Sequence, residues 1–254
     1  MSIKKILKSL IAATDLLLPR SCMICGRKLL VEESHLCISC AAGLPLTYFW
    51  NQDRNPMADR FNEGIQAALE EDRASSPERY AYACALFYYN DETGYRNIPH
   101  QIKYGGYIPA GVYFGRILGR RIAGCRYLKD IDIVIPVPLH WRRKWERGYN
   151  QAAAIGKGVA ESLGVEMNES ILTRVRHTRS QTKMDIDQKR ANVMGAFEVR
   201  SEKDAALIKA GHILLVDDIF TTGSTLMACF VALRTVFPPS VRISIATLGF
   251  VGGA

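Results

Sequence analysis

The sequence has no apolar segment long enough to cross a lipid bilayer. Its longest stretch without Lys, Arg, Asp or Glu covers residues 34–52, and this stretch contains two Cys, one Gly and one Pro. Because a transmembrane helix needs about 20 predominantly apolar residues, we expect no membrane span. Residues 3–18 are partly apolar, but Lys8 and Asp15 interrupt them and no cleavage motif of small residues follows. We interpret this segment as an amphipathic helix and expect a cytoplasmic protein.

Two common nucleotide-binding motifs are also absent. The sequence contains neither G-x-x-x-x-G-K-[ST] nor G-x-G-x-x-G, which excludes a P-loop and argues against a dinucleotide-binding fold. What it does contain is an excess of basic residues, with 33 Lys and Arg against 25 Asp and Glu and a formal net charge of +8. That excess favours partners that carry phosphate, such as nucleotides, phosphosugars or nucleic acid.

Four of the seven cysteines form two C-x2-C pairs. Cys22 and Cys25 make the first pair, and Cys37 and Cys40 make the second after eleven intervening residues. Two such pairs can each hold one side of a tetrahedral zinc ion, and Gly26 lets the chain turn sharply beside the thiolates. Four protein ligands leave no open position for water or substrate. The spacing therefore predicts a structural zinc site.

The other three cysteines and one histidine bear on this prediction. Cys84, Cys125 and Cys229 lie in apolar segments, where we expect them to be small core side chains. Unpaired cysteines of this kind indicate a reducing compartment, which argues against disulfides as the alternative for the two C-x2-C pairs. His35 lies between the pairs and is an alternative ligand.

The pattern of apolar residues predicts an α/β fold. Residues 51–79 are polar and irregular, and we interpret them as a linker or a peripheral helix. The expected strands are residues 80–89, 131–137, 171–175, 212–216 and 241–248, and the expected helices are residues 109–122, 150–163 and 224–236. Alternating strands and helices predict a parallel sheet with right-handed crossovers. We divide the chain into an N-terminal helix and zinc module (1–50), a linker (51–79) and an α/β domain (80–254).

Residues 212–226 are the most informative segment. Four apolar residues of a buried strand lead to Asp217 and Asp218, and a hydroxyl-rich loop then enters a helix. Ligands of open α/β sheets bind at the carboxyl ends of the strands. The loop offers hydroxyls, close backbone approach at a glycine and free helix amides for one phosphate dianion. Its residues are Thr221, Thr222, Gly223, Ser224 and Thr225.

The two acids need a separate explanation, because adjacent carboxylates would repel a phosphate. We interpret Asp217 and Asp218 as contacts for a polyol or a cation, for which the hydroxyls of a phosphoribosyl group are suitable. The alternative is a capped helix with surface acids.

Further basic and turn-forming residues follow the strand at 131–137. Pro136, Val137 and Pro138 end that strand, and the cations Arg142, Arg143, Lys144 and Arg147 come next. Arginine forks match phosphate oxygens in pairs, so these residues suit a pyrophosphate group, with a solvated basic helix as the alternative.

Three further segments add to this set. Gly148, Tyr149, Asn150 and Gln151 form a turn in which Asn150 can cap the next helix. Lys103, before two glycines, is either a further cation for the same charge or a surface lysine. The basic segment 177–195 is either a loop that closes over substrate or a mobile surface segment.

These motifs together resemble a known family. Residues 216–225 are similar to the phosphoribosyl pyrophosphate loop of the type I phosphoribosyltransferases, and the whole chain resembles the ComF family, which joins a zinc knuckle to that fold. The resemblance rests on the four clustered cysteines, residues 102–106, 136–139 and 147–151, Gln181, Arg190, Asn192 and the loop. It implies a parallel sheet flanked by helices with a small N-terminal module built on four zinc-binding cysteines. Members of the family are named for natural competence, the uptake of external DNA.

Two functions follow as hypotheses. In the first, the protein is a phosphoribosyltransferase that binds phosphoribosyl pyrophosphate with Mg²⁺, holds the ribose on Asp217 and Asp218, and transfers the phosphoribosyl group to a nitrogen nucleophile. In the second, it is a non-catalytic protein that binds single-stranded DNA alongside other competence proteins. Trp141 and Trp145 lie within the basic run, where rings can stack on bases, with core packing as the alternative.

Overall fold

The computed structural model describes residues 14–15, 17–71, 77–175, 195–201 and 208–252. Most of the helix expected at 3–18 and nearly all of the basic segment 177–195, with Gln181, Arg190 and Asn192, lie outside these ranges. Within the described residues, no helix is both long and apolar enough to cross a membrane.

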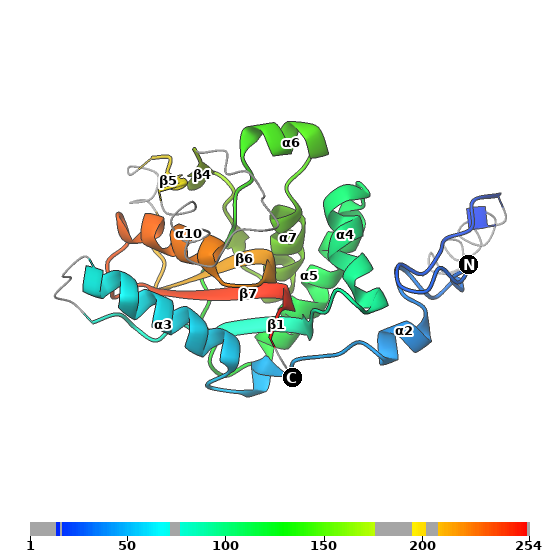
Figure 1. Cartoon of the computed structure of the whole chain (residues 1–254), viewed down its shortest axis with the longest axis horizontal. Coiled ribbons are helices and arrows are strands. Elements are labelled where there is room, and N and C mark those ends of the chain that lie inside the picture. Colours follow the sequence, from blue (N-terminus) through cyan, green and yellow to red (C-terminus); the bar gives the residue numbers. More distant parts are fainter. Residues whose placement is uncertain (1–13, 16, 72–76, 176–194, 202–207, 253–254) are drawn as a thin grey trace.

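A parallel five-stranded sheet forms the centre of the molecule (Figure 1). Its strands lie in the order β1 (Ala83–Tyr88), β7 (Arg242–Phe250), β6 (His212–Phe220), β2 (Ile133–Pro136) and β3 (Glu166–Met167). Each strand is parallel to its neighbours. Nearly continuous apolar runs are typical of strands that are buried on both faces. Four of the five strands expected from those runs are present in this sheet.

The strand expected at 171–175 has a different partner. It forms β4 (Leu172–Arg174), which pairs in the antiparallel sense with β5 (Phe197–Val199) in a separate two-stranded sheet. Only Leu172 of its three residues is buried, so this short strand lacks the two buried faces of a central strand. The edge of the main sheet is instead β3, which the apolar pattern did not indicate.

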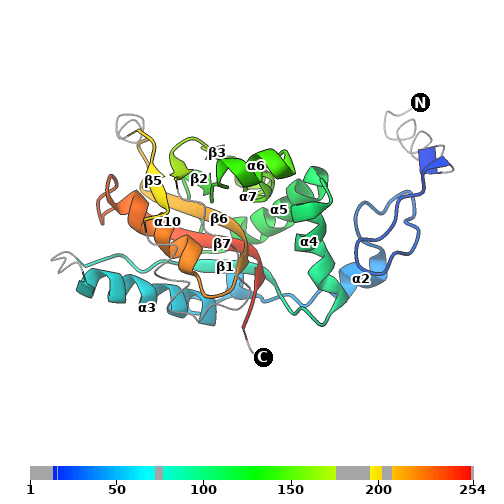
Figure 2. The same ribbon diagram turned by 45° about the horizontal axis from the view of Figure 1, so that its top comes forward.

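Helices cover both faces of the sheet (Figures 1 and 2). One layer contains α5 (Ile108–Ala123) and α7 (Gln151–Leu163), and the other contains α3 (Pro56–Glu71) and α10 (Ser224–Arg234). Side chains of β6 alternate between two cores: Ile213 and Leu215 pack with residues of α3 and α10, whereas Leu214 and Val216 pack with residues of α5 and α7. This alternation follows from the pleat of a strand. The predicted α/β fold class is confirmed.

Residues 56–71, which we expected as a linker or a peripheral helix, form helix α3. Met57, Phe61 and Ile65 recur every four residues on one side of α3, and each is at most 1% exposed in the core beneath β1. The helical alternative therefore describes this segment, and the helix is part of the main core rather than a free connection. The division into domains stays a prediction.

Shorter elements complete the described chain. They are α2 (Ile38–Ala42), α4 (Asn97–Tyr104), α6 (Trp141–Arg147) and the 3-10 helices η1 (Phe49–Asn51) and η2 (Gly94–Arg96). The N-terminal module extends to one side of the sheet, beyond α4 (Figure 1). Met23 of this module shares a buried cluster with Ile98 and Ile102 of α4, and Gln101 Nε2 donates a hydrogen bond to Met23 O at 3.4 Å. The module is thus packed against α4.

Candidate functional site

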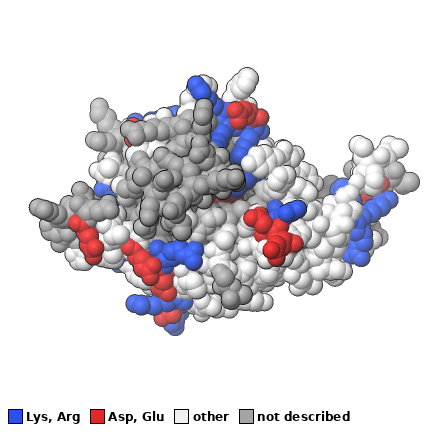
Figure 3. Space-filling model, viewed as in Figure 1, with Lys and Arg blue, Asp and Glu red and all other residues white. Residues whose placement is uncertain are grey.

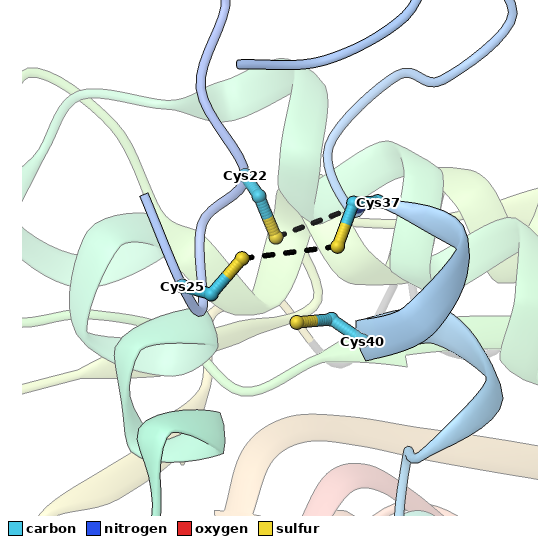
Figure 4. A group of neighbouring side chains, drawn as sticks. All are labelled: Cys22, Cys25, Cys37 and Cys40. Carbon is cyan, nitrogen blue, oxygen red and sulfur yellow. Dashed lines mark hydrogen bonds between the residues drawn. The ribbon is translucent and has the colours of Figure 1, made fainter. Parts of the chain in front are cut away.

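The four clustered cysteines converge on one point (Figure 4). Their sulfur atoms all lie within 4.8 Å of one another, and the Sγ atoms of Cys25 and Cys37 are 3.8 Å apart. A zinc–sulfur bond of about 2.3 Å implies a sulfur–sulfur distance of about 3.8 Å in a tetrahedron. The cluster therefore has the size and the donor set of a tetrahedral zinc site.

Main-chain turns and N–H groups surround the thiols of this cluster. Gly26 adopts a φ of 72°, and its N–H donates to Cys22 O at 2.9 Å. The N–H of Cys37 points at Cys22 Sγ at 3.4 Å. A hydrogen bond from the main chain of Cys40 lowers the pKa of Cys37 to about 6, whereas burial raises the pKa of Cys40, so Cys37 is the more readily ionised of these two thiols.

The other three cysteines and His35 lie outside the four-cysteine cluster. Cys84, Cys125 and Cys229 are buried free thiols, at most 2% exposed, which confirms their role as core side chains. His35 is not a member of the ligand group found among the described residues. Its ring packs edge-on against Tyr107 and Tyr113, with centroids 5.2 and 4.7 Å apart. His35 helps to seat the module on the body of the protein.

Asp217 and Asp218 lie in the last part of β6, at the carboxyl edge of the sheet. The strand continues to Phe220, so the acids belong to the strand itself rather than to the loop after it. They are only 9% and 5% exposed, which rules out the alternative of surface acids. The N–H of Asp218 donates to Asp217 Oδ1 at 2.8 Å, and that of Ile219 donates to Asp218 Oδ1 at 2.9 Å.

The two carboxylates meet different surroundings. Lys103 Nζ lies 2.7 Å from Asp218 Oδ2, and the lysine side chain is 26% exposed, so Lys103 is a paired residue rather than a surface lysine. Burial opposes the charge of Lys103, but attraction to Asp218 outweighs it and raises the pKa of the lysine. Asp217 interacts electrostatically with Lys103 as well, and also with Cys229 of α10 and Arg174 of β4. Burial, followed by repulsion from Asp218, raises the pKa of Asp217 to about 8.

The hydroxyl-rich loop begins immediately after β6. Gly223 is the N-cap of α10 with a φ of 78°, and a Cβ there would lie 2.7 Å from the Phe220 ring. This position therefore needs glycine. The hydroxyls of Thr222 and Ser224 are 2.8 Å apart. Gly223 provides no side-chain cap for α10. The N–H of Ser224 donates to Thr222 Oγ1 at 3.4 Å, and the next amides of the first turn are in the arrangement that binds anions.

A cavity of about 620 Å³ is lined by residues of α4 and α6 and of the turns that follow them, but not by the two acids or by residues 221–225. Lys103, which pairs with Asp218, is one of its lining residues. The cavity brings together three residues of the predicted site, Lys103, Arg147 and Tyr149, with Arg143 of the basic run. Its full lining consists of Lys103, Tyr104, Gly105, Gly106, Arg143, Glu146, Arg147 and Tyr149. Three of these side chains are cations and one is an anion, so the cavity favours an anionic ligand.

Residues 148–151 form the turn that follows α6, and Tyr149 of this turn lines the cavity. Gly148 has a φ of 77° at the end of α6, and Asn150 caps α7 by accepting from Ala152 N–H at 3.1 Å. Asn150 Nδ2 also donates to Val137 O at 3.0 Å, which joins this turn to the Pro136–Pro138 segment. Gln151 accepts from Arg147 Nη1 at 3.1 Å. The predicted cap is confirmed, and these residues order the turn between the basic helix and α7.

Val137 connects that turn to the acids, because its N–H donates to Val216 O at 2.9 Å. The prolines on either side end β2 beside β6. Arg174 is a member of the site that the sequence did not indicate, since the expected strand 171–175 gave no reason to place it near Asp217. Burial, followed by repulsion from Arg143, lowers the pKa of Arg174.

Helix α6 carries an exposed pair of tryptophans. Trp141 is 65% exposed and Trp145 is 86% exposed, so the alternative that they pack in the core is wrong. They share one side of α6, whereas Arg143 and Arg147 lie on the other side and line the cavity. Lys and Arg side chains gather over this part of the molecule (Figure 3). The guanidinium of Arg142 lies 5.2 Å from the Trp141 ring centroid.

Comparisons with known proteins place these features in context. No family model matches the chain. The chain is 34% identical over 116 residues to competence protein F of Haemophilus influenzae, covering 46% of this chain and 50% of that protein. It is 30% identical over 129 residues to the DNA utilization protein YhgH of Salmonella typhi, covering 50% of this chain and 55% of that protein. The chain thus spans about half the length of the curated relatives it matches.

Among solved structures, the glutamine phosphoribosylpyrophosphate amidotransferase of B. subtilis, in complex with ADP and GMP, aligns with a TM-score of 0.34 and 17% identity. That alignment covers 54% of this chain and 26% of the other. The sequence relatives, together with the four-cysteine cluster, confirm the resemblance of this chain to the ComF family.

Proposed function

We propose that this protein binds phosphoribosyl pyrophosphate, or a related phosphosugar or nucleotide, at the carboxyl end of β6. The observation that carries the proposal is the buried pair of Asp217 and Asp218, with Lys103 on Asp218 and a basic cavity beside it. Burial of two acids is costly unless they are paired or hydrogen-bonded, and a carboxyl with a perturbed pKa at a sheet edge, such as that of Asp217, is typical of functional sites.

Each part of a phosphoribosyl pyrophosphate has a counterpart in this arrangement. The 5-phosphate belongs on residues 221–225, where hydroxyls and helix amides meet. The ribose hydroxyls belong on Asp217 and Asp218, and the pyrophosphate belongs in the cavity with Arg143 and Arg147, whose forks match its oxygens. Mg²⁺ would be held mainly by the phosphate oxygens of the ligand, with few protein ligands of its own.

The corresponding reaction is transfer of the phosphoribosyl group. The bond from C1 to the pyrophosphate oxygen would break, and a nitrogen nucleophile would form a bond to C1 and release its proton to solvent. Pyrophosphate would leave with its charge offset by the cavity cations and by the Mg²⁺ that it carries. The protein would contribute position and charge stabilisation. Lys103 would hold Asp218 in place for the ribose.

Calorimetry tests the binding part of this proposal. Phosphoribosyl pyrophosphate with Mg²⁺ should bind the wild-type protein, and Asp217→Asn combined with Asp218→Asn should weaken it more than it weakens inorganic phosphate. Equal weakening of both ligands in a folded variant would contradict the assigned roles. Incubation with a panel of amines and bases then tests transfer, because pyrophosphate release should require an added acceptor.

A second candidate function is binding of single-stranded DNA, and the exposure of Trp141 and Trp145 favours it. Large aromatic side chains that are exposed in pairs mark interaction surfaces, and rings beside cations are the usual platform for single strands. The relatives named competence protein F and DNA utilization protein YhgH support a role with DNA. This function uses the opposite side of α6 from the cavity, so both functions are compatible.

Titration of a labelled oligothymidine at several salt concentrations tests the DNA proposal. The slope of log K against log salt should be about −0.7 for each phosphate contacted. Trp145→Ala should weaken binding by about 1–3 kcal/mol if the ring stacks on a base. Tyr48, another aromatic residue with more than half of its surface exposed, gives the control variant Tyr48→Ala. No binding at low salt would remove this candidate.

A further inference from the structure

Arg60 of helix α3 reaches the loop that we propose to hold phosphate. Its Nη1 donates to Thr221 O at 2.9 Å and to Val251 O at 3.3 Å. Its guanidinium carbon lies 5.5 Å from the centroid of the Phe250 ring. Thr221 is the first residue of the loop, so a residue from the segment expected as a linker contacts the loop directly.

This contact joins the segments that follow strands β6 and β7 at the edge of the sheet. The N–H of Val251 donates to Phe220 O at 2.8 Å, and Arg60 then connects the carbonyl groups of Val251 and Thr221. The loop therefore leaves β6 in a direction that is fixed from both β7 and α3. A guanidinium has five N–H donors in a rigid plane, which suits a bridge between two carbonyls better than the single ammonium of lysine.

Among the residues that the structure describes, no acid forms an ion pair with Arg60. In the part of the chain that the structure describes, the ion pairs are Arg20–Asp15, Lys103–Asp218, Arg116–Glu161 and Arg234–Glu78. Arg60 is exposed, and its two hydrogen bonds go to neutral carbonyls. A full positive charge therefore remains beside the hydroxyl-rich loop, where it attracts an anion and offsets the repulsion from the nearby acids.

We propose that Arg60 is a positioning residue of the 221–225 loop and that its charge makes this loop selective for a phosphate monoester dianion, the end group of a phosphosugar or nucleotide. The inference rests on the proposed small-molecule function and adds to it the residue and the charge state that the phosphate end requires. Binding of the pyrophosphate end should not depend on Arg60, because we place that end in the cavity that Lys103 lines.

The experiment compares two probes by calorimetry with Mg²⁺ present. Ribose 5-phosphate tests the loop, and pyrophosphate tests the cavity. Arg60→Gln should raise the Kd of ribose 5-phosphate about tenfold, the loss of one charged hydrogen-bonding group, and should leave the Kd of pyrophosphate within about twofold. Arg79→Gln is the matched control, since Arg79 Nη1 also donates to a carbonyl, Ser240 O at 3.0 Å, before the start of β7.

A pH series distinguishes an effect of the Arg60 charge on the ligand from a purely structural role of Arg60 in the loop. A phosphate monoester gains its second charge with a pKa of about 6. Ribose 5-phosphate should therefore bind the wild-type protein more tightly as the pH rises from about 5.5 to about 7.5, and this gain should be smaller in Arg60→Gln. Arg60→Lys keeps the charge but not the fork, and it should restore the pH response while recovering only part of the affinity.

The outcomes are distinguishable. Equal weakening of both probes in Arg60→Gln, or the same result in Arg79→Gln, overturns the inference while the proposed function stands. Failure of the wild-type protein to bind either probe overturns the proposed function and the inference together. If circular dichroism finds Arg60→Gln unfolded, Arg60→Lys decides, because unchanged ribose 5-phosphate affinity in that variant would show that the fork is not needed.

Discussion

Removal of the cation from the partly buried pair of Lys103 and Asp218 should destabilise the protein. Lys103→Met keeps the length of the side chain but leaves Asp218, which is 5% exposed, without its partner at 2.7 Å. Breaking a fully buried pair costs about 3–5 kcal/mol, and exposed pairs contribute about 0–1 kcal/mol. Because the lysine side chain is 26% exposed, we expect an intermediate loss of about 2–3 kcal/mol.

The chain contains a matched control for this prediction. Arg116 and Glu161 form a pair at the same distance, 2.7 Å, but their side chains are 51% and 39% exposed. Arg116→Met should therefore cost less than about 1 kcal/mol. The two pairs have the same contact distance and differ in burial as well as in residue type, so the comparison tests whether burial sets the size of the loss.

Urea unfolding in phosphate-free buffer measures both losses. For a chain of this size, each kcal/mol corresponds to about 2–4 °C in Tm, so thermal unfolding provides a second reading. Asp218→Asn added to Lys103→Met should recover part of the loss, because it removes the uncompensated charge. Equal losses in the two single variants, or a loss below about 1 kcal/mol for Lys103→Met, would refute the argument from burial.

The remaining predictions concern metal content and pH. Purified protein should contain one zinc per chain, Cys25→Ser should lower that content, and Cys84→Ser should leave it unchanged because this thiol is buried outside the cluster; elemental analysis with no chelator present decides. The pKa of Asp217 rises from 3.8 to about 8 on folding, so its contribution to stability is complete below pH 3.8 and is lost as the pH rises through about 8. Between those two pH values, the free energy of unfolding in urea should fall with rising pH in the wild-type protein and fall less in Asp217→Asn. Parallel curves for the two proteins would contradict the raised pKa of Asp217.

Four strands of the main sheet, and the position of the acids near the carboxyl end of β6, were predictable because they depend on local sequence. A buried strand followed by Asp217 and Asp218 has few interpretations, and the C-x2-C spacing is as direct. Helix α3 was less visible, because its large buried residues, Met57, Phe61 and Ile65, are separated by small and polar residues that dominate the composition. The partner of β4 could not be predicted, since a three-residue strand carries too little pattern to choose between two sheets.

The site contacts that could not be predicted are those between segments that lie far apart in the sequence. Lys103 and Arg60 resemble ordinary surface residues in the sequence, and only the packing of α4 and α3 brings them to Asp218 and Thr221. Trp145 differs from expectation in the opposite direction. A tryptophan in a short helix is more often expected to be buried, but this side chain is exposed. The chemical type of these residues was clear in the sequence, whereas their neighbours required the fold.

The alternation of side chains along β6 has a mechanical consequence. Asp217 points to the layer that contains α10, and Asp218 points to the layer that contains α4. A small molecule bonded to both carboxylates would therefore fasten the two layers together across the end of the sheet. Since α4 also carries Gln101, which holds Met23 of the cysteine module, that stiffening would extend from α10 to the far side of the molecule.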